Sequence, residues 1–122
     1  GQTVRYLTNC YPTYHNERRE EKSMNVIATD CESYMRLLVD GRVDTNTSPQ
    51  LQQAILNAFQ KKKDVVVDFL NVPYISSAGL RALLIGQKTA ASKGGSMKLT
   101  NVSDVVMNIL EMSGFSKILK IE

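Results

Sequence analysis

The chain has 122 residues, of which 43% are hydrophobic and 22% are charged, and its formal net charge is +3. This length fits a single domain, and so small a positive excess does not favour a nucleic-acid-binding protein, which needs a broad basic face. No apolar run approaches the roughly 20 residues of a membrane span, and two cysteines are too few for a small secreted domain held by disulfides. We therefore expect a cytoplasmic protein in which Cys10 and Cys31 are free thiols.

Residues 1–23 differ from the rest because they hold few aliphatic residues and contain the charge run ERREEK. Two alternatives are open for this N-terminal extension: it is disordered, or its segment TVRYL pairs with the edge of a sheet. We expect the extension to be dispensable for folding, because it contributes almost no periodic apolar face. The domain itself is placed at residues 24–122.

Strand-like and helix-like segments then alternate. Two strand-like runs are separated by the polar residues 30–33, which predicts a hairpin. Ser48 is expected to cap the first helix, with Pro49 at its first position. The apolar residues of that helix have the spacing of one buried stripe: Leu51, Ala54, Ile55, Ala58 and Phe59.

The β-branched run in DVVVDFLNV predicts a strand that is covered on both faces. A second helix follows over SSAGLRALLIGQKTAASKGG and ends at its two glycines, and its apolar residues are Leu80, Leu83, Leu84 and Ala91. SMKLTNV predicts a short strand, Ser103 caps a third helix that Gly114 ends, and KILKIE predicts a last strand. The order predicts an α/β fold, with a single-domain mixed β-sheet of four to five strands flanked by three or four helices.

Two adjacent serines, Ser76 and Ser77, lie between the most apolar strand and the second helix. They are candidates for helix caps, for a nucleophile or for the acceptor of a covalent modification. A nucleophile elbow needs glycine where Ile75 lies, and the only histidine, His15, is in the extension, so a hydrolase is not expected. No motif indicates a cofactor or a metal site. Capping and phosphate acceptance remain, since anions are favoured at a helix N-terminus.

The stretch VVVDFLNVPYISSAGLRALL resembles the signature of the STAS family, the domain shared by sulphate transporters and anti-sigma factor antagonists. LLVDGRVDTNTSPQL and ILEMSGFSKILKI resemble other parts of the same family, so the resemblance covers about residues 24–122 and implies the STAS fold. The positions that match the signature are Asp68, Val72, Tyr74, Ile75, Ser77, Gly79 and Leu80.

The resemblance implies an anti-sigma factor antagonist, also called an anti-anti-sigma factor. Such a protein is a phosphoprotein of bacterial transcription regulation and not an enzyme. In this family the phosphorylated serine precedes a small residue and a glycine, which is Ser77 here, with Ser76 as the alternative acceptor. The implied partners are an anti-sigma factor with a serine-kinase ATPase fold, released on phosphorylation, and a serine phosphatase. The implied partner-binding residues are Asp44, Thr45, Ser76, Ser77, Ala78, Gly79 and Leu80.

A second kind of function stays open. The chain would then be a constitutive STAS interaction module, or a ligand-sensing one, in a transporter-associated or stress-signalling complex. Neither reading requires a cofactor, a nucleic acid or a membrane span.

Overall fold

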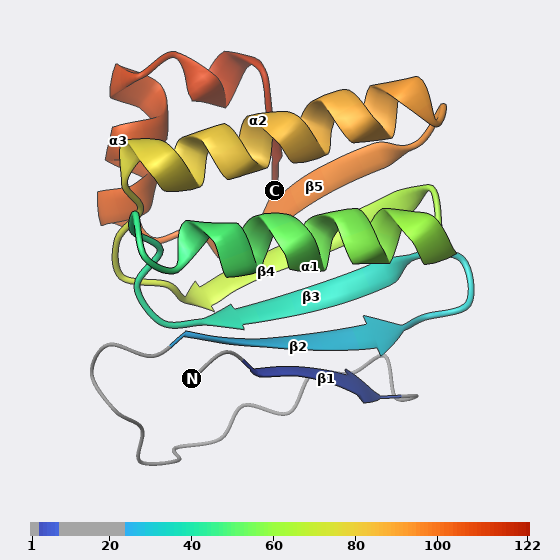
Figure 1. Ribbon diagram of the computed structural model, residues 1–122. Coiled ribbons are helices and arrows are strands. Elements are labelled where there is room, and N and C mark those ends of the chain that lie inside the picture. The colour runs from blue at the N-terminus through green and yellow to red at the C-terminus, as the bar shows by residue number, and fades with distance from the viewer. Residues whose placement is uncertain (1–2, 8–23) are drawn as a thin grey trace.

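The computed structural model of the protein describes the backbone of residues 3–7 and the whole of residues 24–122. Six strands form one sheet in chain order, and helices α1 and α2 lie side by side on one face of it (Figure 1). The strands are β1 (Thr3–Leu7), β2 (Asn25–Asp30), β3 (Met35–Asp40), β4 (Asp64–Asn71), β5 (Ser96–Thr100) and β6 (Lys120–Ile121). The helices are α1 (Ser48–Lys61), α2 (Ser77–Ser92) and α3 (Asp104–Met112), followed by the 3-10 turn η1 (Phe115–Lys117).

The sheet is mixed, which confirms the predicted fold class. Strands β2 and β3 form the predicted antiparallel hairpin, while β3, β4, β5 and β6 are parallel to one another. The sheet has one strand more than the upper count expected, because Thr3–Leu7 pairs in parallel with β2 along five residues. Of the two alternatives for the N-terminal extension, the described part therefore shows sheet pairing. Residues 8–23, with Cys10 and His15, lie outside the described residues.

The core lies between the sheet and helices α1 and α2. All five apolar residues predicted to form the stripe of α1 are buried. In α2 the prediction holds for Leu80 and Leu83, but Leu84 is only half-buried and Ala91 is exposed, since Ala90 faces the core instead. On β4, the side chains of Val65, Val67 and Phe69 lie on the core face. Their burial holds β4 in place, and the serine turn follows the end of this strand.

Two predicted boundaries were wrong. Helix α1 begins at Ser48 with Thr47 as its N-cap residue, so Ser48 is the first helical residue and not the cap. The Thr47 hydroxyl does not cap the helix, because it donates to the carbonyl oxygen of Arg42 (2.8 Å) and accepts from the backbone N–H of Asp44 (2.9 Å). The last predicted strand is reduced to Lys120–Ile121, because the chain before it turns through η1.

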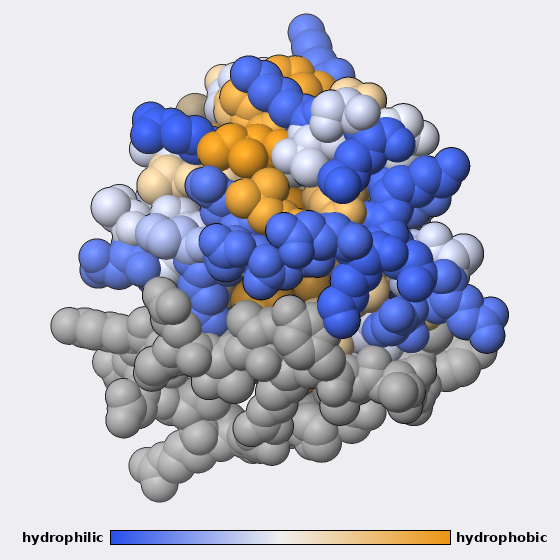
Figure 2. Space-filling model, turned by 45° about the vertical axis from the view of Figure 1, so that its right-hand side comes forward, coloured by the Kyte–Doolittle hydropathy of each residue, from blue (hydrophilic) through white to orange (hydrophobic). Residues whose placement is uncertain are grey.

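Polar side chains cover much of the described surface in Figure 2, and apolar residues gather toward the top of that view. The large apolar side chains that are exposed among residues 24–122 are Leu70, Val105, Met112 and Ile118. Within the described parts of the chain, every helix is too short or too polar to cross a bilayer. Cys31 is buried, and its thiol donates to the carbonyl oxygen of Thr29 at 3.8 Å.

Candidate functional site

The serine turn lies beside the loop that precedes α1. The backbone N–H of Val43 donates to the carbonyl oxygen of Tyr74 (3.0 Å), and that of Ser76 donates to the carbonyl oxygen of Val43 (2.8 Å). Val43 and Ile75 thus form a parallel bridge beyond the last residues of β3 and β4. The structure therefore brings together two segments that the sequence separates by about thirty residues. They meet at the carboxyl ends of parallel strands, where α/β proteins commonly place their sites.

The two serines have different positions in this turn. Ser76 is the N-cap of α2 and is half-buried, and its Oγ accepts from the backbone N–H of Gly79 at 3.4 Å. Ser77 is the first residue of the helix and is exposed. Of the two candidate caps, Ser76 is therefore the one that caps α2. Ser77 is the serine hydroxyl that a second protein can reach most readily.

Asp44 organises the neighbouring loop. Its Oδ1 accepts from the backbone N–H groups of Asn46 (2.9 Å) and Thr47 (3.1 Å), so the carboxylate holds the loop in a tight turn. Asp44 follows Val43, whose carbonyl oxygen accepts from the backbone N–H of Ser76, so the loop that carries Asp44 adjoins the serine turn. Thr45 is exposed next to it. The loop next to the serine turn thus carries a carboxylate, and the role of Asp44 in partner binding stays a prediction.

Arg42, which the sequence analysis did not single out, lies two residues before Asp44 in the same segment. The guanidinium of Arg42 lies 4.3 Å from the centre of the Tyr74 ring, and its Nε is 3.7 Å from Asp44 Oδ2. The Arg42 side chain is 59% exposed, so this ion pair is screened by water and contributes little to stability. The two-residue spacing of Arg42 and Asp44 is the sequence signal for the pair, but it is common in any extended segment.

Three of the predicted partner-binding residues lie at or under the turn. Gly79 and Leu80 are buried, and Ala78 is half-buried. A Cβ atom at Gly79 would lie 2.5 Å from Ile75 Cγ1 and 2.7 Å from Val43 Cγ1. Gly79 and Leu80 therefore support the turn from below, and the exposed members of the predicted set are Thr45 and Ser77.

Asp68, which matches the family signature, lies away from the serines. Its side chain is fully buried, and its Oδ2 accepts from Arg36 Nη2 at 2.6 Å. Its Oδ1 accepts from the backbone N–H of Leu70 (2.9 Å) and from Asn101 Nδ2 (3.1 Å). This network joins β3, β4 and the turn after β5, so Asp68 has a structural role.

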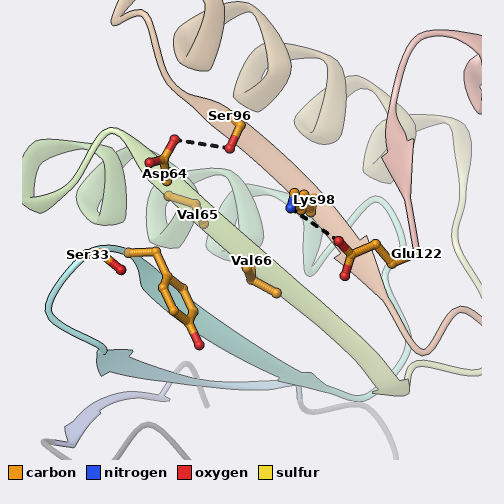
Figure 3. A pocket seen from close by; sticks show the side chains of 8 residues that line it. Ser33, Asp64, Val65, Val66, Ser96, Lys98 and Glu122 are labelled. Atoms are coloured by element: carbon orange, nitrogen blue, oxygen red, sulfur yellow. Dashed lines mark hydrogen bonds and ion pairs between the residues drawn. The ribbon is translucent and has the colours of Figure 1, made fainter.

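A pocket of about 360 Å³ lies near the opposite ends of the strands, where β4 and β5 begin (Figure 3). Two polar pairs line it: Ser96 Oγ donates to Asp64 Oδ1 (3.0 Å), and Lys98 Nζ lies 3.2 Å from Glu122 Oε1. The polar groups of each pair thus bind each other. Because β4 starts at Asp64 and the serine turn follows its far end, the pocket does not belong to the serine site.

The described residues contain no cluster of three or more metal-ligating side chains. His15, the only histidine, lies outside the described residues. The surface at the serine turn therefore combines the exposed Ser77 with the adjoining loop that carries the Arg42 and Asp44 ion pair.

Comparison with known proteins identifies the family. A family model described as "Mlab, STAS domain" matches residues 30–120, so the chain belongs to the STAS domain family. An anti-sigma F factor antagonist of Paenibacillus polymyxa is 31% identical over 85 residues, which cover 68% of this chain and 73% of that protein. An anti-sigma-B factor antagonist of Bacillus subtilis is 24% identical over 99 residues, which cover 81% of this chain and 91% of that protein.

Solved structures show the same fold. An anti-sigma factor antagonist from Mycobacterium paratuberculosis superposes with a TM-score of 0.73 at 21% identity, covering 81% of this chain and 85% of that one. The Bacillus cell fate determinant SpoIIAA in its phosphorylated form gives a TM-score of 0.58 at 14% identity, covering 82% and 91%. The predicted STAS fold is thus confirmed.

Proposed function

We propose that the protein is an anti-sigma factor antagonist whose binding is controlled by phosphorylation of Ser77. The observation that carries the proposal is the division of roles in the turn: Ser76 caps α2, while Ser77 is exposed at the first helical position. The names of the curated relatives support the function class. The existence of a phosphorylated form of SpoIIAA, a protein with the same fold, supports the mode of control.

In the proposed cycle the unphosphorylated protein binds an anti-sigma factor that has a serine-kinase ATPase fold. The surface of contact comprises the outward residues of the turn and of the loop, with Thr45 and Ser77 at its centre. The protein itself catalyses nothing and acts in the cytoplasm. The partner kinase transfers a phosphoryl group to Ser77, the complex dissociates, and a serine phosphatase restores the binding form.

The physical basis of release is charge. A phosphate adds about −1.5 to −2 charges at neutral pH, and the loop that carries the Asp44 carboxylate adjoins the turn. In a desolvated interface, juxtaposed like charges cost several kcal/mol, and each 1.4 kcal/mol changes affinity about tenfold. We therefore expect phosphorylation to weaken binding by roughly a hundredfold or more.

The test combines site mapping with binding. The protein is incubated with its cognate anti-sigma kinase and ATP, the phosphate is located by mass spectrometry, and affinity for the kinase is measured before and after. Ser77→Ala should bind permanently and resist phosphorylation, whereas Ser76→Ala, the matched control, should still be phosphorylated. Phosphate on Ser76 alone would overturn the site assignment, and phosphate on neither serine would overturn the proposed control.

The pocket of Figure 3 favours a second candidate function, a ligand-sensing or constitutive interaction module of a larger complex. The description of the matching family model, "Mlab, STAS domain", does not itself specify a sigma-factor pathway. Native mass spectrometry of the protein purified from its host decides this point. A stoichiometric small molecule that is lost on Lys98→Gln would favour sensing, and a partner bound regardless of Ser77→Asp would favour a constitutive module.

A further inference from the structure

Helix α2 carries an arginine one turn beyond Ser77. On an α-helix the side chain of a residue can contact the side chains of the residues three and four positions before and after it. For Arg81 these positions are Ser77, Ala78, Leu84 and Ile85, so Ser77 is its only polar neighbour along the helix. Arg81 and Ser77 are both exposed.

The direction of the side chains brings the two residues together. Long side chains on a helix lean toward its N-terminus and cover the preceding turn, so the guanidinium of Arg81 extends toward Ser77. Residues at this spacing have Cβ atoms about 5–6 Å apart, which a phosphorylated serine and an arginine side chain span easily.

Within residues 24–122, Arg81 also has no competing ion-pair partner. None of the ion pairs between described residues involves it, and α2 contains no acidic residue. Arg42, the other arginine near the turn, is already paired with Asp44 and lies over the Tyr74 ring. The guanidinium on the same helix as Ser77 is therefore the one available to a new anion.

We propose that Arg81 is the intramolecular ligand of the phosphate on Ser77, binding it across one turn of α2. This inference rests on the proposed function for the presence of the phosphate, but it concerns how the modified serine is held. Arginine suits the task because its planar guanidinium binds phosphate oxygens in a bidentate manner. The phosphate would then be fixed against the first turn of the helix and partly neutralised there.

The test places phosphoserine at position 77 during translation, by reassignment of a stop codon, so that no kinase is needed. Phosphorus NMR then follows the second ionisation of the phosphate as a function of pH. Loss of a neighbouring cation favours the protonated form. We expect Arg81→Gln to raise the proton affinity of the phosphate two- to threefold, as for a helical ion pair of about 0.5 kcal/mol.

Two variants remove one positive charge elsewhere and serve as matched controls. Lys88→Gln removes it from an exposed position of the same helix, and Arg42→Gln removes it from the adjacent loop. Lys88→Gln should leave the proton affinity of the phosphate unchanged, and Arg42→Gln should change it less than Arg81→Gln does. Arg81→Lys should raise it less than Arg81→Gln, because lysine keeps the charge but loses the fork geometry.

An unchanged titration in Arg81→Gln, or an equal change in Arg42→Gln, would overturn the assignment. These outcomes are separate from those of the kinase experiment. If Arg81 affects the phosphate but no kinase modifies the protein, only the proposed function is contradicted. If a kinase phosphorylates Ser77 but the titration does not depend on Arg81, only this inference is contradicted.

Discussion

Ser76 and Ser77 are adjacent in the sequence, yet they differ in what they contact. The Ser76 hydroxyl satisfies a backbone N–H of the first helical turn, whereas Ser77 lies on the solvent side. Removing a capping hydroxyl costs about 0.5–2 kcal/mol, and an exposed substitution changes stability by less than about 0.5 kcal/mol.

We therefore expect Ser76→Ala to lower the free energy of unfolding by about 1 kcal/mol and Ser77→Ala to leave it almost unchanged. Urea unfolding followed by circular dichroism measures both. Equal losses in the two variants would contradict the division of roles on which the proposed site depends.

Gly79 offers a prediction of a different kind. The space next to its Cα is filled by the side chains of Ile75 and Val43, so Gly79→Ala should strain the turn. Overpacking of this kind costs typically 1–3 kcal/mol. Gly86→Ala in the middle of α2 should cost less, because its nearest neighbour is the sulfur of the flexible Met97 and because alanine gains about 1 kcal/mol in a helix interior. Thermal melting compares the two, and a larger loss for Gly86→Ala would show that the turn is not tightly packed.

At the scale of elements, β1 changes what is expected of the N-terminal extension. The sequence favours a dispensable segment, but Thr3–Leu7 pairs with five residues of β2. Each interstrand hydrogen bond contributes about 0.5–1.5 kcal/mol, partly offset by the entropy of ordering the strand. A chain that begins at Met24 should therefore lose more than about 1 kcal/mol of stability. A loss below about 0.5 kcal/mol would restore the original expectation.

Proline substitutions test the same pairing without shortening the chain. In an edge strand the backbone N–H groups of successive residues point alternately to the neighbour and to solvent, and proline is tolerated only where the N–H faces solvent. Val4→Pro and Arg5→Pro should thus differ clearly in melting temperature. Similar melting temperatures for both, equal to that of the unchanged chain, would show that β1 adds no stability.

The segments that the sequence predicted well are those with a strong period. The apolar stripe of α1 and the Ser103 cap of α3 depend on local spacing, and both are present. The start of α1 was missed by one residue, because the Thr47 hydroxyl binds Arg42 and Asp44 in a way that no local pattern indicates. The same distinction applies to the candidate site. The serine turn is a local motif that the sequence shows, whereas the contact of Arg42 with Tyr74 depends on tertiary structure.

For the whole molecule, the network around Asp68 ties the sheet together on the face away from α1 and α2. Its carboxylate accepts three hydrogen bonds while fully buried. Removing one partner of a buried ion pair costs about 3–5 kcal/mol.

Asp68→Ala should therefore lower stability by about 3–5 kcal/mol without altering an exposed surface. Asp64→Ala is the matched control, because Asp64 is only half-buried and bonds to Ser96, and it should cost less than about 1.5 kcal/mol. Chemical denaturation gives both values. A tolerated Asp68→Ala would mean that Asp68 matches the family signature for a reason other than stability.

The order of the six strands in space is their order along the chain. Each strand after the first can therefore pair with the strand made just before it, after closure of one connecting segment. The paired residues of β3 and β4, and those of β4 and β5, are about 30 residues apart in the sequence, and the closure of such long connections slows the folding of a parallel sheet. During translation the sheet can grow from one edge as the ribosome synthesises each strand. No strand then has to stay exposed until a much later part of the chain has been made.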